Sequence, residues 1–343
     1  MNYSVLMSVY DKEKPEYLKQ SIESMLNQTV KPEQFVVVED GALNKSLSDI
    51  IDKYKADFNE LFTIVKLQVN GGLGNALNQG LKACRNELVA RMDSDDISLP
   101  RRCEKELKLF LDNPELSIVG TNIDEFWDNP NEIKCSRIVP SSYEEIKKNI
   151  GRIQPFNHPT VMYKRSEVLK CGGYPTTRRN EDRKLFSVMI MNNCKAENIN
   201  ESLLLYRSDK NNYKRRKSWR NCIGCIKVSY SLWRKNLCRF SDFIYVLVGQ
   251  IFLFILPLVH LGYINSLIPS LKIPNFIFGE LSLTFQGNIL ICLIYGLYFG
   301  IYGLMFFVPV LMILKKENII KAFKENIKFH KLLTLKERIS LIG

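Results

Sequence analysis

Three carboxylates stand within four residues of the chain, in the stretch "ELVARMDSDDISLPRR" (87–102). They are Asp93, Asp95 and Asp96, and they follow an apolar run that is typical of a buried strand. Carboxylates this close repel one another, and hard oxygen ligands of this kind suit Mg²⁺ or Mn²⁺, which bind substrate phosphates directly. An alternative is that the turn only caps a helix that starts near Pro100. One Asp or Ser would suffice for a cap, so the sequence favours a divalent cation site.

The elements that must position this turn are indicated by hydrophobic periodicity. Near-continuous apolar runs predict strands at 3–10, 34–40, 63–69 and 87–93. Apolar residues at helical spacing predict helices at 15–28, 46–58 and 73–84. This alternation predicts an α/β fold with a Rossmann-like, mostly parallel sheet and helices on both faces.

Each of the four predicted strands ends in polar or glycine-rich residues. The ends are Ser8-Val9-Tyr10, Glu39-Asp40-Gly41, the loop 70–74 and the turn 93–96. Ligands of open α/β sheets bind beyond the carboxyl ends of the strands. We therefore expect these four ends to line one ligand-binding edge.

Five stretches in this order resemble family 2 glycosyltransferases with the GT-A fold, of the bacterial surface-polysaccharide type. They are "SVLMSVYDKEKPEYLKQSIESMLNQT", "FVVVEDG", "NGGLGNALNQGLKACRNELVARMDSDD", "NHPTVMYKRSEVLKCGGY" and "NEDRKLF", and the resemblance covers roughly residues 3–220. Two departures matter. The usual Asp-Asp before the glycine is Glu39-Asp40, which leaves the second carboxylate in place. The segment "YKRRKSW" (213–219) is not the Gln-x-x-Arg-Trp motif of processive synthases, which counts against a polymerising enzyme.

The resemblance implies a role for each residue of the donor site. Asp40 is expected to accept the uracil N3–H of a UDP-sugar, with Ser8 and Tyr10 flanking the base. Asp93 is expected to bind the ribose or the sugar. Asp95 is expected to hold the Mn²⁺ or Mg²⁺ that bridges the diphosphate, and Asp96 is the second candidate for that role.

The resemblance also implies an acceptor side. Asp182, in "NEDRKLF", is expected to be the general base that takes the proton of the acceptor hydroxyl, and a single base implies inversion at the anomeric carbon. The alternative is that Asn180 caps a helix with Glu181 and Asp182 in its first turn. Asn157 and His158 lie in the acceptor-facing segment, although a lone histidine is more often structural, and both interpretations of His158 stay open.

The net charge of +12 lies in the C-terminal part of the chain. Residues 201–343 hold 20 Lys and Arg against 7 Asp and Glu. The basic residues of 207–239 come with no nucleic-acid fold signature, so we expect no nucleic acid partner and favour lipid head groups or phosphates. The start of the chain lacks a basic leader, so we expect no signal peptide.

Two hydrophobic segments predict C-terminal membrane helices. Residues 289–314 contain no charge and are long enough to span a bilayer, whereas 243–264 contain Pro257 and either span or lie in the interface. The flanking Lys and Arg residues predict that both ends face the cytoplasm. We therefore predict three parts: a GT-A domain at 1–240, a membrane hairpin at 241–315 and an amphipathic helix on the cytoplasmic face at 316–343.

These inferences combine into one functional prediction. The chain is expected to be a metal-dependent, inverting hexosyltransferase at the cytoplasmic face of the cell membrane, in cell-surface polysaccharide biosynthesis. Its partners are expected to be a nucleotide-sugar donor, a lipid-linked saccharide acceptor and membrane lipids. Two alternatives are a sugar nucleotidyltransferase, which would need no base at Asp182, and a non-catalytic membrane scaffold with a decayed GT-A fold.

Overall fold

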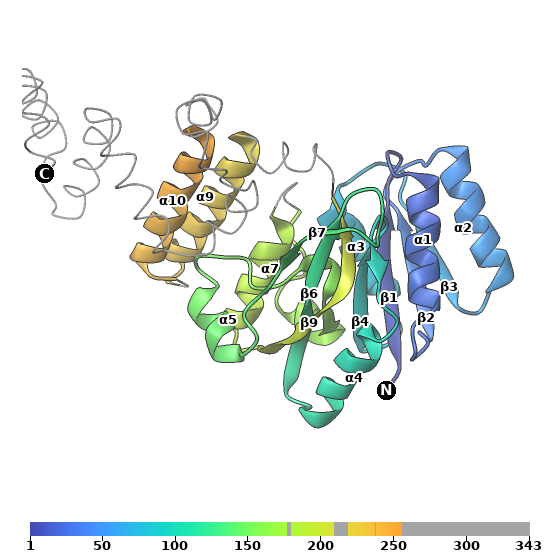
Figure 1. Ribbon diagram of the computed structural model, residues 1–343, viewed down its shortest axis with the longest axis horizontal. Helices are drawn as coiled ribbons and strands as arrows, with labels where there is room; N and C mark the ends of the chain where they lie inside the picture. The colour runs from blue at the N-terminus through green and yellow to red at the C-terminus, as the bar shows by residue number, and fades with distance from the viewer. Residues whose placement is uncertain (177–179, 209–218, 237, 256–343) are drawn as a thin grey trace, which may run out of the picture. The chain divides into compact units, whose positions relative to one another are not determined.

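The structure, a computed structural model, describes residues 1–176, 180–208, 219–236 and 238–255 (Figure 1). The described residues belong to the first of two compact units, Met1–Leu267. The strands are β1 (Tyr3–Val9), β2 (Gln34–Glu39), β3 (Phe62–Lys66), β4 (Leu88–Asp93), β5 (Ile97–Ser98), β6 (Leu116–Phe126), β7 (Ile133–Arg137), β8 (Met162–Lys164) and β9 (Lys195–Arg207).

Helices connect these strands. They are α1 (Pro15–Leu26), α2 (Lys45–Asp57), α3 (Leu73–Ala83), α4 (Arg102–Asp112), α5 (Tyr143–Asn149), the 3₁₀ helix η1 (His158–Thr160), α6 (Arg165–Lys170), α7 (Glu181–Met191), α9 (Trp219–Arg234) and α10 (Phe240–Ile255). The four strands and three helices predicted for residues 3–93 are confirmed, with ends that differ by a few residues. Local signals explain the helix starts: Pro15 opens α1, and the Asn44 side chain accepts a hydrogen bond from the Leu47 N–H at the start of α2.

The strands form one mixed sheet in the order β3-β2-β1-β4-β8-β6-β9-β5, with β7 paired to β6. The first four strands in this order are parallel, as predicted. The prediction of a mostly parallel sheet is wrong for the other half. There β8 runs antiparallel to both β4 and β6, and β9 is parallel to β6 but antiparallel to β5.

Two apolar layers hold helices on opposite faces of the sheet, as predicted (Figure 1). One layer packs α1, α2 and α4 against side chains such as Val5 and Val37, and the other packs α3 and α7 against alternate residues such as Leu6 and Val38. Side chains of a strand alternate between faces, so an apolar run buried on both faces suits a sheet covered on both sides. At Gly80 of α3 an added Cβ would lie 2.2 Å from a Leu6 methyl group, so the helix sits close to the sheet.

The helices α9 and α10 are the last described elements, and the predicted domain boundary at residue 240 stays a prediction. None of the helices in the described ranges combines the length and apolar character that a membrane crossing requires. The predicted membrane segment 243–264 is described only as far as residue 255, and the segments 289–314 and 316–343 lie outside the described residues.

Glu106 of α4 carries a buried carboxyl group that makes the folded state sensitive to pH. It is fully buried, and neither carboxyl oxygen has a hydrogen-bond partner in the part of the chain that the structure describes. Burial raises the pKa of Glu106 to about 8, against the opposing effect of Arg102. Because the folded state binds this proton more tightly than the unfolded state, the stabilisation is complete below pH 4.5 and is lost as pH rises through 8.

We therefore expect Glu106→Gln, which keeps the size of the side chain without the titration, to flatten this pH dependence. Each unit of pKa shift corresponds to about 1.4 kcal/mol, so the wild-type protein is expected to lose up to a few kcal/mol of unfolding free energy between pH 5 and pH 9. Denaturant unfolding at several pH values measures the difference. The control is Glu104→Gln on the same helix, because Arg101 lowers the pKa of the solvated Glu104. A pH profile of stability that is the same in Glu106→Gln and in the wild-type protein would contradict the assignment.

Candidate functional site

The register of the parallel strands brings three of the predicted strand ends together. Ser8 of β1 is paired with Asp93 of β4, and the next residue of β1, Val9, is paired with Glu39 of β2. The chain therefore places Asp40 and the turn 93–96 on either side of the end of β1. Tyr10 follows β1 and is 40% exposed at this edge. The predicted ligand-binding edge is thus formed by the carboxyl ends of β2, β1 and β4.

Asp40 holds the glycine-rich loop that precedes α3. Its two carboxylate oxygens accept hydrogen bonds from the Gly71 N–H (2.8 Å) and the Gly72 N–H (3.0 Å). The Asn70 side chain donates to the Asp40 carbonyl oxygen. Gly41 has φ +88, and a Cβ there would lie 2.8 Å from the Asn70 nitrogen, so the loop packs directly on this turn. A carboxylate has about four acceptor positions, so Asp40 can hold this loop and still accept a further N–H.

The Asp-rich turn gathers its three carboxylates around one point. Oxygens of Asp93, Asp95 and Asp96 all lie within 4.8 Å of one another. Burial, with the charge of Asp93 and then Glu13, raises the pKa of Asp95 to about 7. Burial and the neighbouring carboxylates also raise the pKa of Asp96. The turn therefore concentrates negative charge that a cation would relieve.

The three carboxylates have different surroundings. Asp93 is half-buried and accepts a hydrogen bond from the guanidinium of Arg91, which is 1% exposed. Asp96 is fully buried; its Oδ1 accepts the Arg207 N–H (2.8 Å), and its Oδ2 lacks a partner among the described residues. Asp95 is half-buried, and it meets Arg207 through its backbone carbonyl oxygen, not through its carboxylate. Asp95 is thus less enclosed than Asp96, and its role as the metal ligand stays a prediction.

Arg207, at the end of β9 in the other half of the sheet, holds the Asp-rich turn in place. Its guanidinium donates to the Asp95 carbonyl oxygen (2.8 Å) and to Gln20 (2.6 Å). The guanidinium carbon lies 3.9 Å from the ring centre of Tyr17 and 4.6 Å from that of Phe126. Two aromatic rings and two hydrogen bonds leave the side chain few alternative positions, so it fixes the backbone that carries Asp95.

The donor set of this turn fits a hard divalent cation. It offers several carboxylate oxygens and no sulfur or nitrogen ligand, which suits Mg²⁺ or Mn²⁺. The unpartnered Oδ2 of Asp96 and the raised pKa values of Asp95 and Asp96 are both expected where a positive charge is missing from a cluster of like charges.

Glu181 and Asp182 form the first turn of α7 and lie within reach of the same charges. Burial, then the charge of Asp182, raises the pKa of Glu181 to about 7; Arg91 and Asp93 also act on it. Asp182 accepts a hydrogen bond from the Gln154 amide (3.0 Å), which orients its carboxylate. Residues Glu181–Met191 form a helix, but the Asn180 side chain makes no capping hydrogen bond, which counts against the alternative that Asn180 caps this helix. The role of Asp182 as a general base stays a prediction.

Asn157 and His158 occupy more enclosed positions than an acceptor-binding role implies. The Asn157 amide is 1% exposed and donates to the carbonyl oxygens of Thr121 and Arg137. The half-buried His158 ring bonds to the Tyr174 hydroxyl (3.0 Å), and burial, then the charge of Arg91, lowers its pKa. The Asn157 side chain therefore braces β6 and β7. An acceptor-binding role for either residue stays a prediction.

Three residues of the site were not singled out in the sequence. Arg91 interrupts the apolar run "LVARMD" with a charged side chain. A charge inside a predicted buried strand is the feature of the sequence that could have indicated it. Gln154 and Arg207 have no local signal, because their partners lie far away in the chain: Asp182 for the first and the turn at Asp95 for the second.

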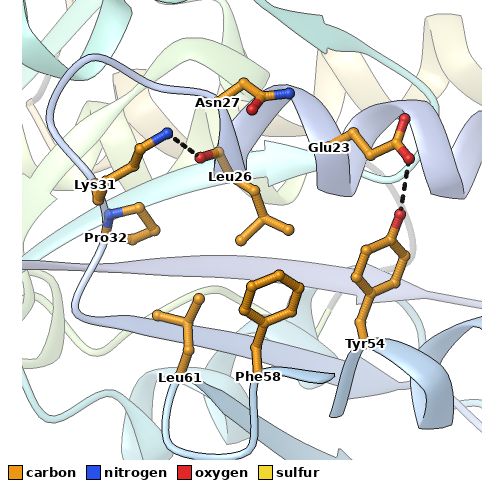
Figure 2. Close-up of a pocket in the computed structure, with 8 residues that line it drawn as sticks. All are labelled: Glu23, Leu26, Asn27, Lys31, Pro32, Tyr54, Phe58 and Leu61. Atoms are coloured by element: carbon orange, nitrogen blue, oxygen red, sulfur yellow. Dashed lines mark hydrogen bonds between the residues drawn. The ribbon is translucent and has the colours of Figure 1, made fainter. Parts of the chain in front are cut away.

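A separate groove of about 510 Å³ lies between α1 and α2 (Figure 2). Figure 2 shows Leu26, Phe58 and Leu61 facing this groove, with Glu23 and Tyr54 hydrogen-bonded at one side. Its lining includes Pro32, two residues before the start of β2, so the groove lies at the opposite end of that strand from Asp40. The groove is therefore not part of the candidate site.

Comparison with known proteins gives the family of this chain. The sequence profile of glycosyl transferase family 2 matches residues 4–173. The chain is 35% identical over 263 residues, 76% of this chain and 94% of the relative, to the UDP-Gal:alpha-D-GlcNAc-diphosphoundecaprenol beta-1,3-galactosyltransferase of Escherichia coli. It is 34% identical over 235 residues, 68% of this chain and 85% of the relative, to the amylovoran biosynthesis glycosyltransferase AmsE of Erwinia amylovora.

Solved structures share the fold at lower sequence identity. The mannosyltransferase PcManGT from Pyrobaculum calidifontis, in complex with GDP-Man and Mn²⁺, has a TM-score of 0.55 at 15% identity, covering 84% of this chain and 80% of that chain. S. aureus TarS 1-349 in complex with UDP-GlcNAc has a TM-score of 0.54 at 18% identity, covering 81% and 77%.

Proposed function

This chain belongs to glycosyl transferase family 2, and from that membership we propose that it transfers a hexose from a UDP-sugar to a lipid-linked saccharide, with inversion at the anomeric carbon. The observation that carries the proposal is the position of the first turn of α7 beside the donor edge of the sheet. At Gly74, directly after the loop that Asp40 holds, an added Cβ would lie 3.5 Å from the Cβ of Glu181, and the charge of Asp93 also acts on Glu181. A donor site and a candidate base therefore lie close enough to serve one reaction.

The donor is proposed to bind across the ends of β1, β2 and β4. Asp40 accepts the uracil N3–H, Ser8 and Tyr10 flank the base, and Asp93 binds the ribose or the sugar. The relative from Escherichia coli carries UDP-Gal in its name, and TarS has been solved with UDP-GlcNAc, which supports a UDP-sugar as donor. The hydrogen bonds from Gly71 and Gly72 to Asp40 also support a UDP-sugar donor, because they hold the Asp40 carboxylate in position before the uracil base binds.

The proposed reaction is a single displacement at C1 of the donor sugar. The acceptor hydroxyl oxygen forms a bond to C1, the bond from C1 to the β-phosphate oxygen breaks, and UDP leaves. Asp182 takes the proton of that hydroxyl, and the Gln154 amide holds its carboxylate in position. Attack opposite to the leaving group inverts C1.

Asp95 is proposed to hold Mn²⁺ or Mg²⁺, with Asp96 as the second candidate. Such an ion supplies positive charge to the diphosphate leaving group. Arg207 and Gln20 position the Asp95 backbone for this task, and Arg91 orients Asp93 beside it. The Mn²⁺ bound in the structural neighbour from Pyrobaculum calidifontis supports a metal of this class.

The acceptor and the location are proposed together. The relative from Escherichia coli is named for a diphosphoundecaprenol-linked acceptor, and AmsE is named for amylovoran biosynthesis. An acceptor of this kind resides in a membrane, and the hydrophobic segments 243–264 and 289–314 would anchor the enzyme at its cytoplasmic face. The proposed process is therefore cell-surface polysaccharide biosynthesis.

A donor screen with the purified full-length protein tests this function. UDP-sugars are supplied with Mn²⁺ and a diphosphate-linked saccharide on a polyprenol, and release of UDP is measured together with the anomeric configuration of the product. UDP release that depends on the acceptor, with an inverted product, is the expected result. Release of pyrophosphate would favour a nucleotidyltransferase. Binding of a UDP-sugar without turnover on any acceptor would favour the non-catalytic scaffold.

A further inference from the structure

The helices α9 and α10 form an antiparallel pair that is fastened to the catalytic domain (Figure 1). Arg183 of α7, next to the proposed base, donates to the Ser229 hydroxyl of α9 (3.0 Å). Arg152 pairs with the buried carboxylate of Asp242 in α10 (2.6 Å). At Gly151 an added Cβ would lie 2.6 Å from the Cβ of Cys238, so the turn between α9 and α10 lies directly against the backbone before Arg152. The pair is thus held to the elements that carry Asp182.

Four aromatic rings cluster where α9 ends and α10 begins. Trp233 stacks on Phe243 with ring centres 5.6 Å apart, and it also contacts Tyr230 (5.7 Å) and Phe240 (5.1 Å). Burial is uneven across this cluster, since Tyr230 is 47% exposed and Phe240 is 43% exposed. Leu232, by contrast, is nearly fully buried. The helix pair therefore turns an aromatic surface outward, away from its own buried contacts.

Basic residues surround this aromatic surface. Lys227, Arg234, Lys235 and Arg239 are all exposed, and none forms a salt bridge with a carboxylate of the described residues. Lys227, Tyr230 and Arg234 are spaced so that they share one face of α9. The single acidic residue in the sequence from 219 to 255 is Asp242, which is already paired with Arg152. The surface thus combines exposed aromatic rings with uncompensated positive charge.

We propose that this aromatic and basic surface, formed by Lys227, Tyr230, Trp233, Arg234, Lys235, Arg239, Phe240 and Phe243, lies in the headgroup region of an anionic phospholipid bilayer. The inference rests on the proposed membrane location and names the part of the described chain that touches the lipid. Tyr and Trp side chains favour the membrane–water interface because they are apolar at one end and polar at the other. Lys and Arg place their charge among anionic head groups while their stems cover apolar surface.

A bilayer explains this combination better than a protein or nucleic acid partner. A nucleic acid would require basic groups tracking a phosphate backbone, whereas here the cations surround a compact aromatic cluster at a helix turn. A protein interface is depleted in Lys, and two of the four cations are Lys227 and Lys235. Interfacial helices carry Lys and Arg beside Trp, Phe and Leu, which is the composition found here.

The attachment of α9 and α10 gives this contact a consequence for the reaction. Arg183 connects α9 to the helix that begins with Glu181 and Asp182, so a bilayer that holds Trp233 also sets the position of the proposed base. A lipid-linked saccharide can extend only as far from the bilayer as its own length. A fixed position of the active centre relative to the head groups would therefore select where along such an acceptor the hydroxyl is attacked.

Tryptophan quenching in the full-length protein tests the contact. The chain has three tryptophans, so the double variant Trp127→Phe/Trp219→Phe leaves Trp233 as the only one. Trp127, which is 36% exposed on the β6–β7 connection, serves as the matched control in the variant Trp219→Phe/Trp233→Phe. Each variant is reconstituted into bilayers that contain phosphatidylglycerol and a lipid with a spin label on its head group. We expect the label to quench the emission of Trp233 and to leave that of Trp127 unchanged.

The outcomes separate this inference from the proposed function. Protein that is present in the bilayers with an unquenched Trp233 would overturn the contact and leave the transferase assignment intact. Protein that fails to associate with bilayers would overturn both the contact and the membrane location, and UDP release would still report transfer independently. Wild-type protein compared with Trp233→Phe repeats the test with one substitution. If Trp233→Phe leaves the quenched share of the emission unchanged, the contact is refuted.

Lipid composition tests the electrostatic part of the contact. In the protein whose only tryptophan is Trp233, we expect weak quenching in neutral phosphatidylcholine. Adding Arg234→Gln/Lys235→Gln/Arg239→Gln to that protein is expected to give equally weak quenching of Trp233 in phosphatidylglycerol. Each Lys or Arg near an anionic surface contributes about a fivefold gain in association, so three contribute on the order of 100-fold. The control neutralises three exposed lysines of other helices, Lys45, Lys53 and Lys108. Equal quenching in both lipids before any substitution would refute the electrostatic part.

Discussion

Asp182→Asn is expected to lower the rate of sugar transfer by about 10²- to 10⁴-fold, the usual contribution of a positioned general base. The substitution keeps the size of the side chain and an oxygen that can accept the Gln154 hydrogen bond, but it removes the group that takes the proton. Affinity for the UDP-sugar should change little, because the donor residues proposed here are on β1, β2 and β4. Calorimetry of donor binding, paired with transfer rates, measures both quantities for each variant.

Glu181→Gln is the matched control for this substitution. Burial, then the charge of Asp182, raises the pKa of Glu181 to about 7, so below pH 7 the Glu181 carboxyl is mostly protonated. The Gln variant resembles that protonated form. We expect it to keep transfer activity below pH 7 and to lose a titration near pH 7 from the rate profile.

The reverse pattern would move the base by one residue. If Asp182→Asn transfers sugar at close to the wild-type rate while Glu181→Gln is inactive, the base is Glu181. If both variants stay active, neither carboxylate takes the proton, and the first turn of α7 serves only as a helix start. Asp40→Asn should show the opposite separation from Asp182→Asn, with donor binding weakened first, since Asp40 is proposed to contact the base of the nucleotide.

Asp95→Asn is expected to remove metal-dependent turnover while the protein stays folded. Asp95 is half-buried beyond the edge of the sheet, so its carboxylate contributes to the site and not to the apolar core. Losing a residue that only orients a metal ligand costs about 10- to 100-fold in metal affinity, and losing a ligand should cost more than that. A titration of UDP release against Mn²⁺ concentration measures the change, with circular dichroism to establish that the variant is folded.

Two further variants are compared in this measurement: Asp96→Asn tests the second candidate ligand, and Asp112→Asn is the control. An Asn side chain in place of Asp96 keeps an oxygen that can accept the Arg207 N–H, so the hydrogen bond between the Asp-rich turn and β9 is preserved. Asp112 is exposed at the end of α4, and its substitution should have no effect. Turnover that responds to Mn²⁺ normally in Asp95→Asn, but weakly in Asp96→Asn, would assign the metal to the buried carboxylate. Normal turnover of both variants at low metal would contradict a metal site in this turn.

The first half of the fold could be predicted from the sequence because its signals are local. Each β-α unit between residues 3 and 93 shows an apolar run followed by apolar residues at helical spacing. Parallel strands joined by helices can be arranged in only a few sheet topologies. The Asp-rich turn was found for the same reason, since it directly follows an apolar strand. The position of Asp40 and of Asp93 relative to Ser8 then followed from the rule that parallel strands end at one edge.

Only the tertiary structure decided the second half of the sheet and the surroundings of the carboxylates. The long strand β9 pairs with β6 and β5, and strand pairing across such distances leaves no periodic trace in either segment. Arg207 contacts the Asp-rich turn across a separation of 112 residues, and Gln154 reaches Asp182 across 28. The sequence shows which residues can carry charge, but whether a carboxylate is free, paired or buried depends on side chains that folding brings from distant segments. That is why Asp95 and Asp96, adjacent in the chain, have different surroundings in the folded protein.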